Sequence, residues 1–208
     1  MSILVLTSDT LSSPAAAGQI EYTSPIFAAT PIGTQRGIVP TQQYYRLDSS
    51  LAGANSTSAQ NIFGVGVMLS ASTVYEFEIF AIFTKSAGTT SHNFQFNFGG
   101  TATINNIGYS VITAYNSGTI PAQITSTLFG LVSNATTATT TINNITGAAV
   151  FHADTIKGTV SVNAGGTFIP QYTLSAAPGG AYTTVAGSFV RISPIGASGA
   201  VINVGTWS

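Results

Sequence analysis

Few side chains in this sequence could act as acids, bases or metal ligands, and the clearest pair is His152 and Asp154. They stand two residues apart in an alternating segment, so both should point to the same face of a strand. A zinc site needs three or four protein ligands, and His92 is the one other imidazole of the chain. The pair therefore indicates hydrogen-bonded turn or edge residues rather than a metal site.

Glu76 and Glu78 are the second candidate pair. They share one face of a predicted strand, as the two carboxylates of a glycosidase must share a site. Their neighbours, however, are aromatic and aliphatic. Charges that flank an apolar strand also protect a sheet edge from pairing with other chains, and the sequence favours this role for both residues.

Other catalytic signatures are weak. A Ser/His/Asp triad is a spatial arrangement that spacing cannot exclude, but no Gly-x-Ser-x-Gly elbow occurs and Ser91-His92 is a common kind of adjacency in a Ser-rich chain. Gly64-Val65-Gly66 lacks the Lys-Ser/Thr or third glycine of a phosphate loop. Enzymes usually need several ionisable groups with tuned pKa values. We therefore predict a protein that is not an enzyme, with no catalytic, cofactor-binding or metal-ligating residues.

Charge is scarce throughout the chain. The 208 residues include five Lys and Arg and six Asp and Glu, or 5%, where about 25% is usual. With a net charge of −1 and scattered basic residues, the chain cannot steer nucleic acid or an anionic membrane toward itself. We expect Arg46, Asp48 and Arg191 to be paired within the chain. A neutral exterior of hydroxyls and amides suits a protein that packs against copies of itself or a larger assembly.

The remaining composition indicates a folded domain without disulfides. The chain is 44% hydrophobic and has no cysteine, so neither disulfides nor thiolate metal sites contribute to the fold. No apolar run approaches the ~18 residues of a membrane-spanning helix. The start of the sequence has no basic region, and its apolar run, Ile3–Leu6, is too short for a secretory signal.

Period-two alternation predicts an all-β fold. In Asn93–Phe98 three Phe alternate with three amides, and in Thr73–Phe83 five apolar residues from Tyr75 to Phe83 share one face. The polar, turn-like connection Lys85–Thr90 predicts that these two strands form a hairpin.

Nine further segments read as strands. Pro170 implies an edge or a bulge in one of them. Short strands with turn signals every eight to twelve residues are typical of an antiparallel β-sandwich or jelly roll. The further segments are Thr101–Ile104, Tyr109–Tyr115, Thr125–Val132, Thr139–Ile145, Ala148–His152, Ile156–Val162, Thr167–Leu174, Ser188–Ser193 and Val201–Trp207.

Residues 1–45 differ from the rest. They hold four prolines, Pro14, Pro25, Pro31 and Pro40, which leave little room for a strand ladder. We expect an extended N-terminal arm or a set of short edge strands at 1–45, followed by one sandwich or jelly-roll domain at 46–208. Such an arm can dock onto a neighbour, or it can meander over its own core.

Several segments resemble a β-rich module in virion proteins of tailed bacteriophages. The resemblance covers residues 44 to 208 and implies a structural or adhesive role on a phage particle. It brings no catalytic residues. The segments are Tyr44–Leu47, Ala59–Gly64, Thr73–Glu78, Ala87–His92, Phe98–Thr103, Lys157–Val160, Gly165–Tyr172 and Val204–Trp207.

The resemblance leaves two functions open. Heptad, collagen-like and long β-helical repeats, the usual signs of a fibre shaft, are missing from the sequence, which favours a capsid decoration (cement) protein on the virion exterior. Such proteins commonly trimerise and bridge subunits of the major capsid protein. The alternative is a tail-fibre or spike tip that binds a host surface glycan. Tyr109, Tyr115, Tyr172 and Trp207 are the aromatic residues that could stack on sugar rings, although core or subunit packing is the more common use of each.

Overall fold

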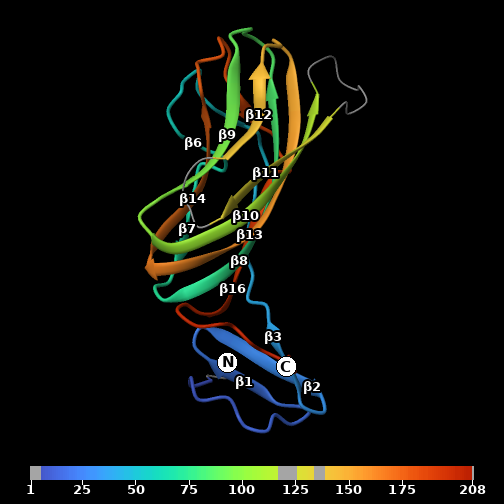
Figure 1. Cartoon of the computed structure of the whole chain (residues 1–208), viewed down its shortest axis with the longest axis vertical. Helices are drawn as coiled ribbons and strands as arrows, with labels where there is room; N and C mark the ends of the chain where they lie inside the picture. The colour runs from blue at the N-terminus through green and yellow to red at the C-terminus, as the bar shows by residue number, and fades with distance from the viewer. Residues whose placement is uncertain (1–5, 117–125, 134–138, 208) are drawn as a thin grey trace.

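The computed structural model describes residues 6–116 and 139–207 in full, together with the backbone of residues 126–133. Within these residues there is no helix, and the strands form three antiparallel sheets of eight, five and three strands. The two larger sheets face each other in the upper part of Figure 1, and the small sheet lies below them. The predicted all-β antiparallel sandwich is therefore confirmed.

The eight-stranded sheet is built around its three longest strands, which lie side by side in the order β10-β13-β8. Its main path runs β11-β10-β13-β8-β15-β5, and β16 pairs with another stretch of β8 and with β4. The strands are β4 (Gln43–Arg46), β5 (Leu51–Ala52), β8 (Thr73–Lys85), β10 (Thr103–Asn116), β11 (Ser126–Ser133), β13 (Val150–Ala164), β15 (Thr183–Thr184) and β16 (Phe189–Ala197).

The five-stranded sheet follows the order β12-β9-β14-β6, with β7 also paired to β14. The expected edge or bulge at Pro170 is found, because β14 pairs with β7 only before this residue and with β6 only after it. Pro170, which has no backbone N–H, therefore lies between the stretch of β14 that pairs with β7 and the stretch that pairs with β6. The strands are β6 (Gln60–Asn61), β7 (Val67–Leu69), β9 (His92–Gly99), β12 (Thr139–Ile145) and β14 (Gly166–Leu174).

The predicted alternation of β8 and β9 is confirmed, but the predicted hairpin is wrong. Phe83 on β8 and Phe94 on β9 are both fully buried, yet β8 pairs with β13, β15 and β16, whereas β9 pairs with β12 and β14. The residues between them cross from one sheet to the other. Each strand has a mainly apolar buried face, and the two faces cover each other across the core, where the Phe83 and Phe94 rings are 5.0 Å apart.

Two predicted segments belong to the single strand β13, which begins at Val150: all of Ile156–Val162, and Ala148–His152 without its first two residues. His152 and Asp154 lie within its paired length, opposite Phe83 and Ala81 of β8. The predicted strand Thr125–Val132 corresponds to β11, although Thr125 itself lies outside the described residues.

Residues 20–39 form the small sheet, from β1 (Ile20–Thr23), β2 (Ile26–Ile32) and β3 (Gln35–Val39). The expected arm thus contains a strand ladder. Its prolines permit this because Pro25 lies in the turn between β1 and β2, Pro31 lies at a register shift between β2 and β3, and Pro40 follows β3. The sandwich begins with β4 at Gln43, just before the boundary expected at residue 46.

The predicted strand at Val201–Trp207 is wrong, because this segment is described and pairs with no strand. After β16 the chain instead runs down beside the small sheet, where both ends of the described chain lie (Figure 1). Ile202 packs against Gly196, and the backbone at Gly205 lies close to Arg36.

Candidate assembly surface

His152 and Asp154 are fully buried on β13. The Nδ1 atom of His152 lies 2.7 Å from Asp154 Oδ2, and the other Asp154 oxygen accepts a 2.5 Å hydrogen bond from Thr113. The imidazole stacks on Phe83 at 4.9 Å and meets Phe94 edge-on at 4.5 Å. The two side chains share a face as predicted, but that face is the sandwich core and not a turn or an edge.

His92 lies in the same end of the core, at the start of β9. Its Nδ1 donates to the Thr90 carbonyl at 2.7 Å, so Nε2 accepts from the Tyr182 hydroxyl at 2.8 Å. Burial lowers the pKa of His92, and the nearby Lys85 ammonium lowers it further. Although His92 and His152 both pack against Tyr182, the described residues contain no group of three His, Cys, Asp or Glu side chains that could hold a metal ion.

Glu76 and Glu78 lie on the outer face of β8. Glu78 accepts hydrogen bonds from Arg191 and lies 3.6 Å from the Lys157 ammonium. Its hydrogen bonds to Arg191, with the charges of both cations, hold the pKa of Glu78 below its usual value. β8 has strands on both sides, so the predicted edge-protecting role is wrong. Glu78 instead ties three neighbouring strands together on their solvent side.

Lys85 is buried where the chain crosses between the sheets. Its ammonium donates to the carbonyls of Gly88 and Gly147 at 2.7 Å and of Ala87 at 3.0 Å. No carboxylate pairs with it in the described part of the chain, and burial lowers the pKa of Lys85. This cation fixes the crossover and is 3% exposed, so it offers little charge to a partner.

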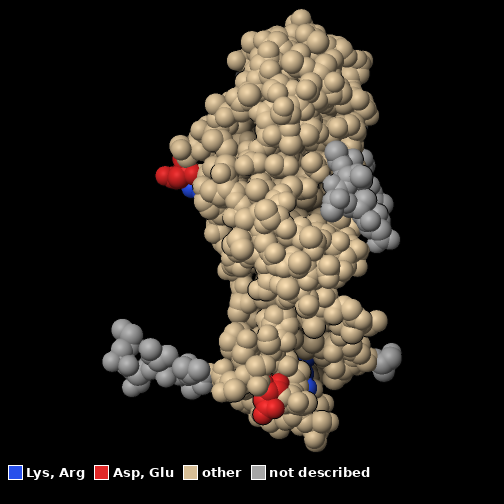
Figure 2. All heavy atoms as spheres, turned by 90° about the vertical axis from the view of Figure 1, so that its left-hand side faces the viewer, with Lys and Arg blue, Asp and Glu red and all other residues tan. Residues whose placement is uncertain are grey.

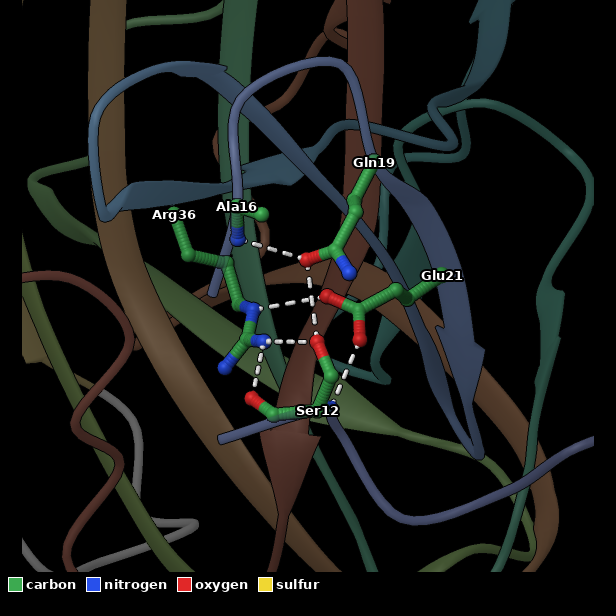
Figure 3. Close-up of polar contacts among 5 residues, drawn as sticks. All are labelled: Ser12, Ala16, Gln19, Glu21 and Arg36. Carbon is green, nitrogen blue, oxygen red and sulfur yellow. Dashed lines mark hydrogen bonds and ion pairs between the residues drawn. The ribbon is translucent and has the colours of Figure 1, made fainter. Parts of the chain in front are cut away.

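Arg36 and Glu21 join the small sheet to the loop before it (Figure 3). Arg36 Nε lies 2.8 Å from Glu21, and its Nη2 donates to the Ser12 carbonyl at 2.6 Å. The Ser12 N–H donates to Glu21 at 2.7 Å, while Gln19 accepts from the Ala16 N–H at 2.7 Å. Hydrogen bonds from Ser12, with the Arg36 charge, lower the pKa of Glu21.

The charged groups are therefore mostly used within the chain. As expected from the sequence, Arg46 pairs with Asp48 at 3.0 Å and Arg191 pairs with Glu78. On the face shown in Figure 2, charged atoms occupy a few small areas and the remaining described surface is uncharged. An exterior of this kind lacks the repulsion that keeps molecules apart.

An apolar groove of about 340 Å³ lies at one side of the sandwich. One wall comes from β4 and β16 of the large sheet, and the other from β14 and the stretch between β6 and β7. No charged residue is among the described residues that line it: Gln43, Tyr44, Tyr45, Phe63, Val65, Gly66, Val67, Met68, Phe77, Ile79, Phe168, Pro170, Val190 and Ile192.

Four large apolar side chains are exposed around this groove. The exposed fraction is 56% for Tyr44, 41% for Tyr45, 43% for Val65 and 65% for Met68. Grouped exposed apolar side chains usually mark a contact surface. Sequence reasoning missed this site. The available signal was the pair of adjacent tyrosines in a short strand after Pro40. Because side chains alternate along a strand, the two tyrosines must lie on opposite faces, and only one of those faces can be the core side.

The aromatic residues considered for sugar stacking lie in different places. Tyr109 and Tyr172 are buried in the core, and Tyr115 is half-buried. Trp207 is 79% exposed, and it lies beside a polar hollow of about 450 Å³ between the small sheet and the C-terminal segment. That hollow is lined by Leu11, Ser12, Ser13, Pro14, Ala15, Thr34, Arg36, Asn203, Val204, Gly205 and Thr206.

No helix long and apolar enough to cross a bilayer occurs in the described ranges 6–116, 126–133 and 139–207. No protein-family model and no curated protein matches the chain.

Proposed function

We propose that this chain is a non-enzymatic structural protein of a bacteriophage particle, placed on the capsid exterior as a decoration protein that bridges capsid subunits. The resemblance to phage virion modules is the reason for proposing a phage particle as the assembly. The observation that carries an assembly role is the uncharged groove beside β4, with exposed Tyr44, Tyr45, Val65 and Met68 around it. Such a surface gains free energy when another protein removes it from water.

The chemistry of the core supports a structural role. The His152–Asp154 pair and His92 are buried among aromatic rings, so a substrate has no described path to them. Glu78 is held as an ion pair by two cations. A glycosidase needs one carboxyl whose pKa is raised so that it can act as an acid, and the pKa of Glu78 is lowered instead.

Particles that lack this chain test the capsid role. Image reconstruction should show that density is missing from the capsid surface, and added purified chain should restore it. A Met68→Lys variant should restore it poorly, because an ammonium would then enter the apolar groove. Ile112→Lys is the matched control, since Ile112 is also exposed but lies on the distant strand β10. Unchanged capsid density in the particles that lack the chain would contradict this role.

A specific observation also favours the alternative, a fibre or spike tip that binds host glycan. The exposed Trp207 indole beside a hollow with hydroxyl, amide and guanidinium groups has the chemistry that recognises a neutral sugar. The purified chain should then bind a glycan array and compete with phage for host cells, and Trp207→Ala should abolish both. Failure to block adsorption counts against this alternative.

A further inference from the structure

The outer edge of β4 is open. In the part of the chain that the structure describes, β4 pairs only with β16, and no strand lies along its other edge. All four residues of β4 are exposed. Its one charged residue, Arg46, is already paired with Asp48 at 3.0 Å. An exposed strand edge with so little charge is a template for pairing with another chain.

The two tyrosines of β4 face opposite sides of the sheet. Tyr44 stacks on Phe189 on the outer face, with ring centroids 5.5 Å apart. Tyr45 meets Phe63 edge-on at 6.2 Å on the core side, where it forms part of the groove. Because side chains alternate along a strand, Arg46 shares the outer face with Tyr44.

We propose that β4 pairs antiparallel with β4 of a second copy of this chain, across a twofold axis beside Tyr45. Residues directly opposite in an antiparallel ladder share a face. Tyr45 then lies against Tyr45 of the second copy on the core side, and Tyr44 lies against Arg46 of the second copy on the outer side. The guanidinium and the phenol ring attract each other. A twofold register centred on Tyr44 loses both of these contacts.

The charges of this surface favour a second copy as the occupant. The described lining of the groove holds no charged residue, so a charged partner would give up hydration there without gaining an ion pair. Across the proposed axis each copy meets the same neutral surface. The contact also brings the exposed Val65 and Met68 of both copies next to the joined edges, and an isologous contact of this kind closes as a dimer.

This inference rests on the proposed function in treating the groove as an assembly surface, but the two are tested separately. The β4 contact is tested on the purified chain alone, whereas the capsid role is tested on particles. The contact predicts a dimer, whereas the resemblance implies a trimer, so the mass in solution also separates the two expectations.

Single cysteines report the register directly because the chain has no cysteine of its own. In the proposed register the two Tyr45 Cα atoms are about 5 Å apart, which a disulfide can span. The two Tyr44 Cα atoms are displaced by two residues along the strands and lie roughly 8 Å apart, which a disulfide cannot span without backbone movement.

Tyr45→Cys should therefore form disulfide-linked dimers under mild oxidation, as seen on a non-reducing gel. Tyr44→Cys and the exposed control Ile112→Cys should remain monomeric on the gel, and circular dichroism should confirm that all three variants fold. Sedimentation of the cysteine-free wild type gives an independent reading and should show a dimer. A monomeric or trimeric wild type, or equal cross-linking of the three variants, would overturn the proposal.

Discussion

Replacement of Phe94 by Ala should be among the most destabilising changes in this chain. Phe94 is fully buried and stacks on Tyr172 at 5.0 Å, and it also meets Phe83 at 5.0 Å and His152 at 4.5 Å. The variant loses the transfer free energy of the ring and leaves a cavity between the sheets. Such changes cost about 3–5 kcal/mol, which for a chain of this length lowers the melting temperature by roughly 6–20 °C.

Phe80→Ala is the matched control. Phe80 lies on the outer face of β8, half-buried against Phe189 with ring centroids 5.9 Å apart, so its removal leaves no enclosed cavity and should cost about 1 kcal/mol. Urea unfolding at fixed pH gives both free energies from the transition midpoints. If the free energies of unfolding of the two variants differ by less than about 1 kcal/mol, then Phe94 is not at the centre of a sandwich core. The two sheets would then not pack face to face as described.

Three further predictions concern the crossover and its buried ionisable groups. Because burial lowers the pKa of Lys85, the folded chain releases the Lys85 proton at a lower pH than the unfolded chain, in which the pKa is near 10.5. Between these two values the urea midpoint of the wild type should rise with pH relative to that of Lys85→Met, whereas Lys157→Met should follow the wild type. The lowered pKa of His92 has the corresponding effect at acid pH, so stability should fall as pH drops below about 6.5, and His92→Gln should reduce this loss. Gly88 has φ +82° and no room for a Cβ atom beside the Pro178 carbonyl, so Gly88→Ala should lower the melting temperature strongly. The control Gly108→Ala adds a Cβ atom that meets no neighbouring atom, and it should leave the melting temperature within a few degrees. Equal melting temperatures for the two variants would refute the crossover geometry.

The sequence predicts the faces of the strands better than their partners. Alternation identified the buried faces of β8 and β9 because it depends on each strand alone. The hairpin prediction failed because the polar residues after Lys85 suit a crossover between sheets as well as a turn within one. What distinguishes the two is a contact that is distant in sequence, because the Lys85 ammonium donates to the Gly147 carbonyl as well as to that of the nearby Gly88.

The candidate site was less predictable than the fold. Tyr109 and Tyr172 have the same residue type as Tyr44 and Tyr45, and only the tertiary structure shows that the first two are buried and the others border a groove. For a related reason the sequence left residues 1–45 open between an extended arm and a set of short edge strands, and did not predict a three-stranded ladder. Prolines oppose a ladder only at positions that must donate a backbone hydrogen bond, and the sequence does not show which positions those are.

Sedimentation of the wild type, Met68→Lys and Ile112→Lys is the most direct test of the assembly role of the groove. The wild type and Ile112→Lys should sediment as dimers. Met68→Lys should dissociate at least about tenfold more readily, equivalent to about 1.4 kcal/mol, because it places an unpaired ammonium beside the joined edges. Equal dissociation constants for all three proteins, or a wild type that stays monomeric at every concentration, would contradict the account.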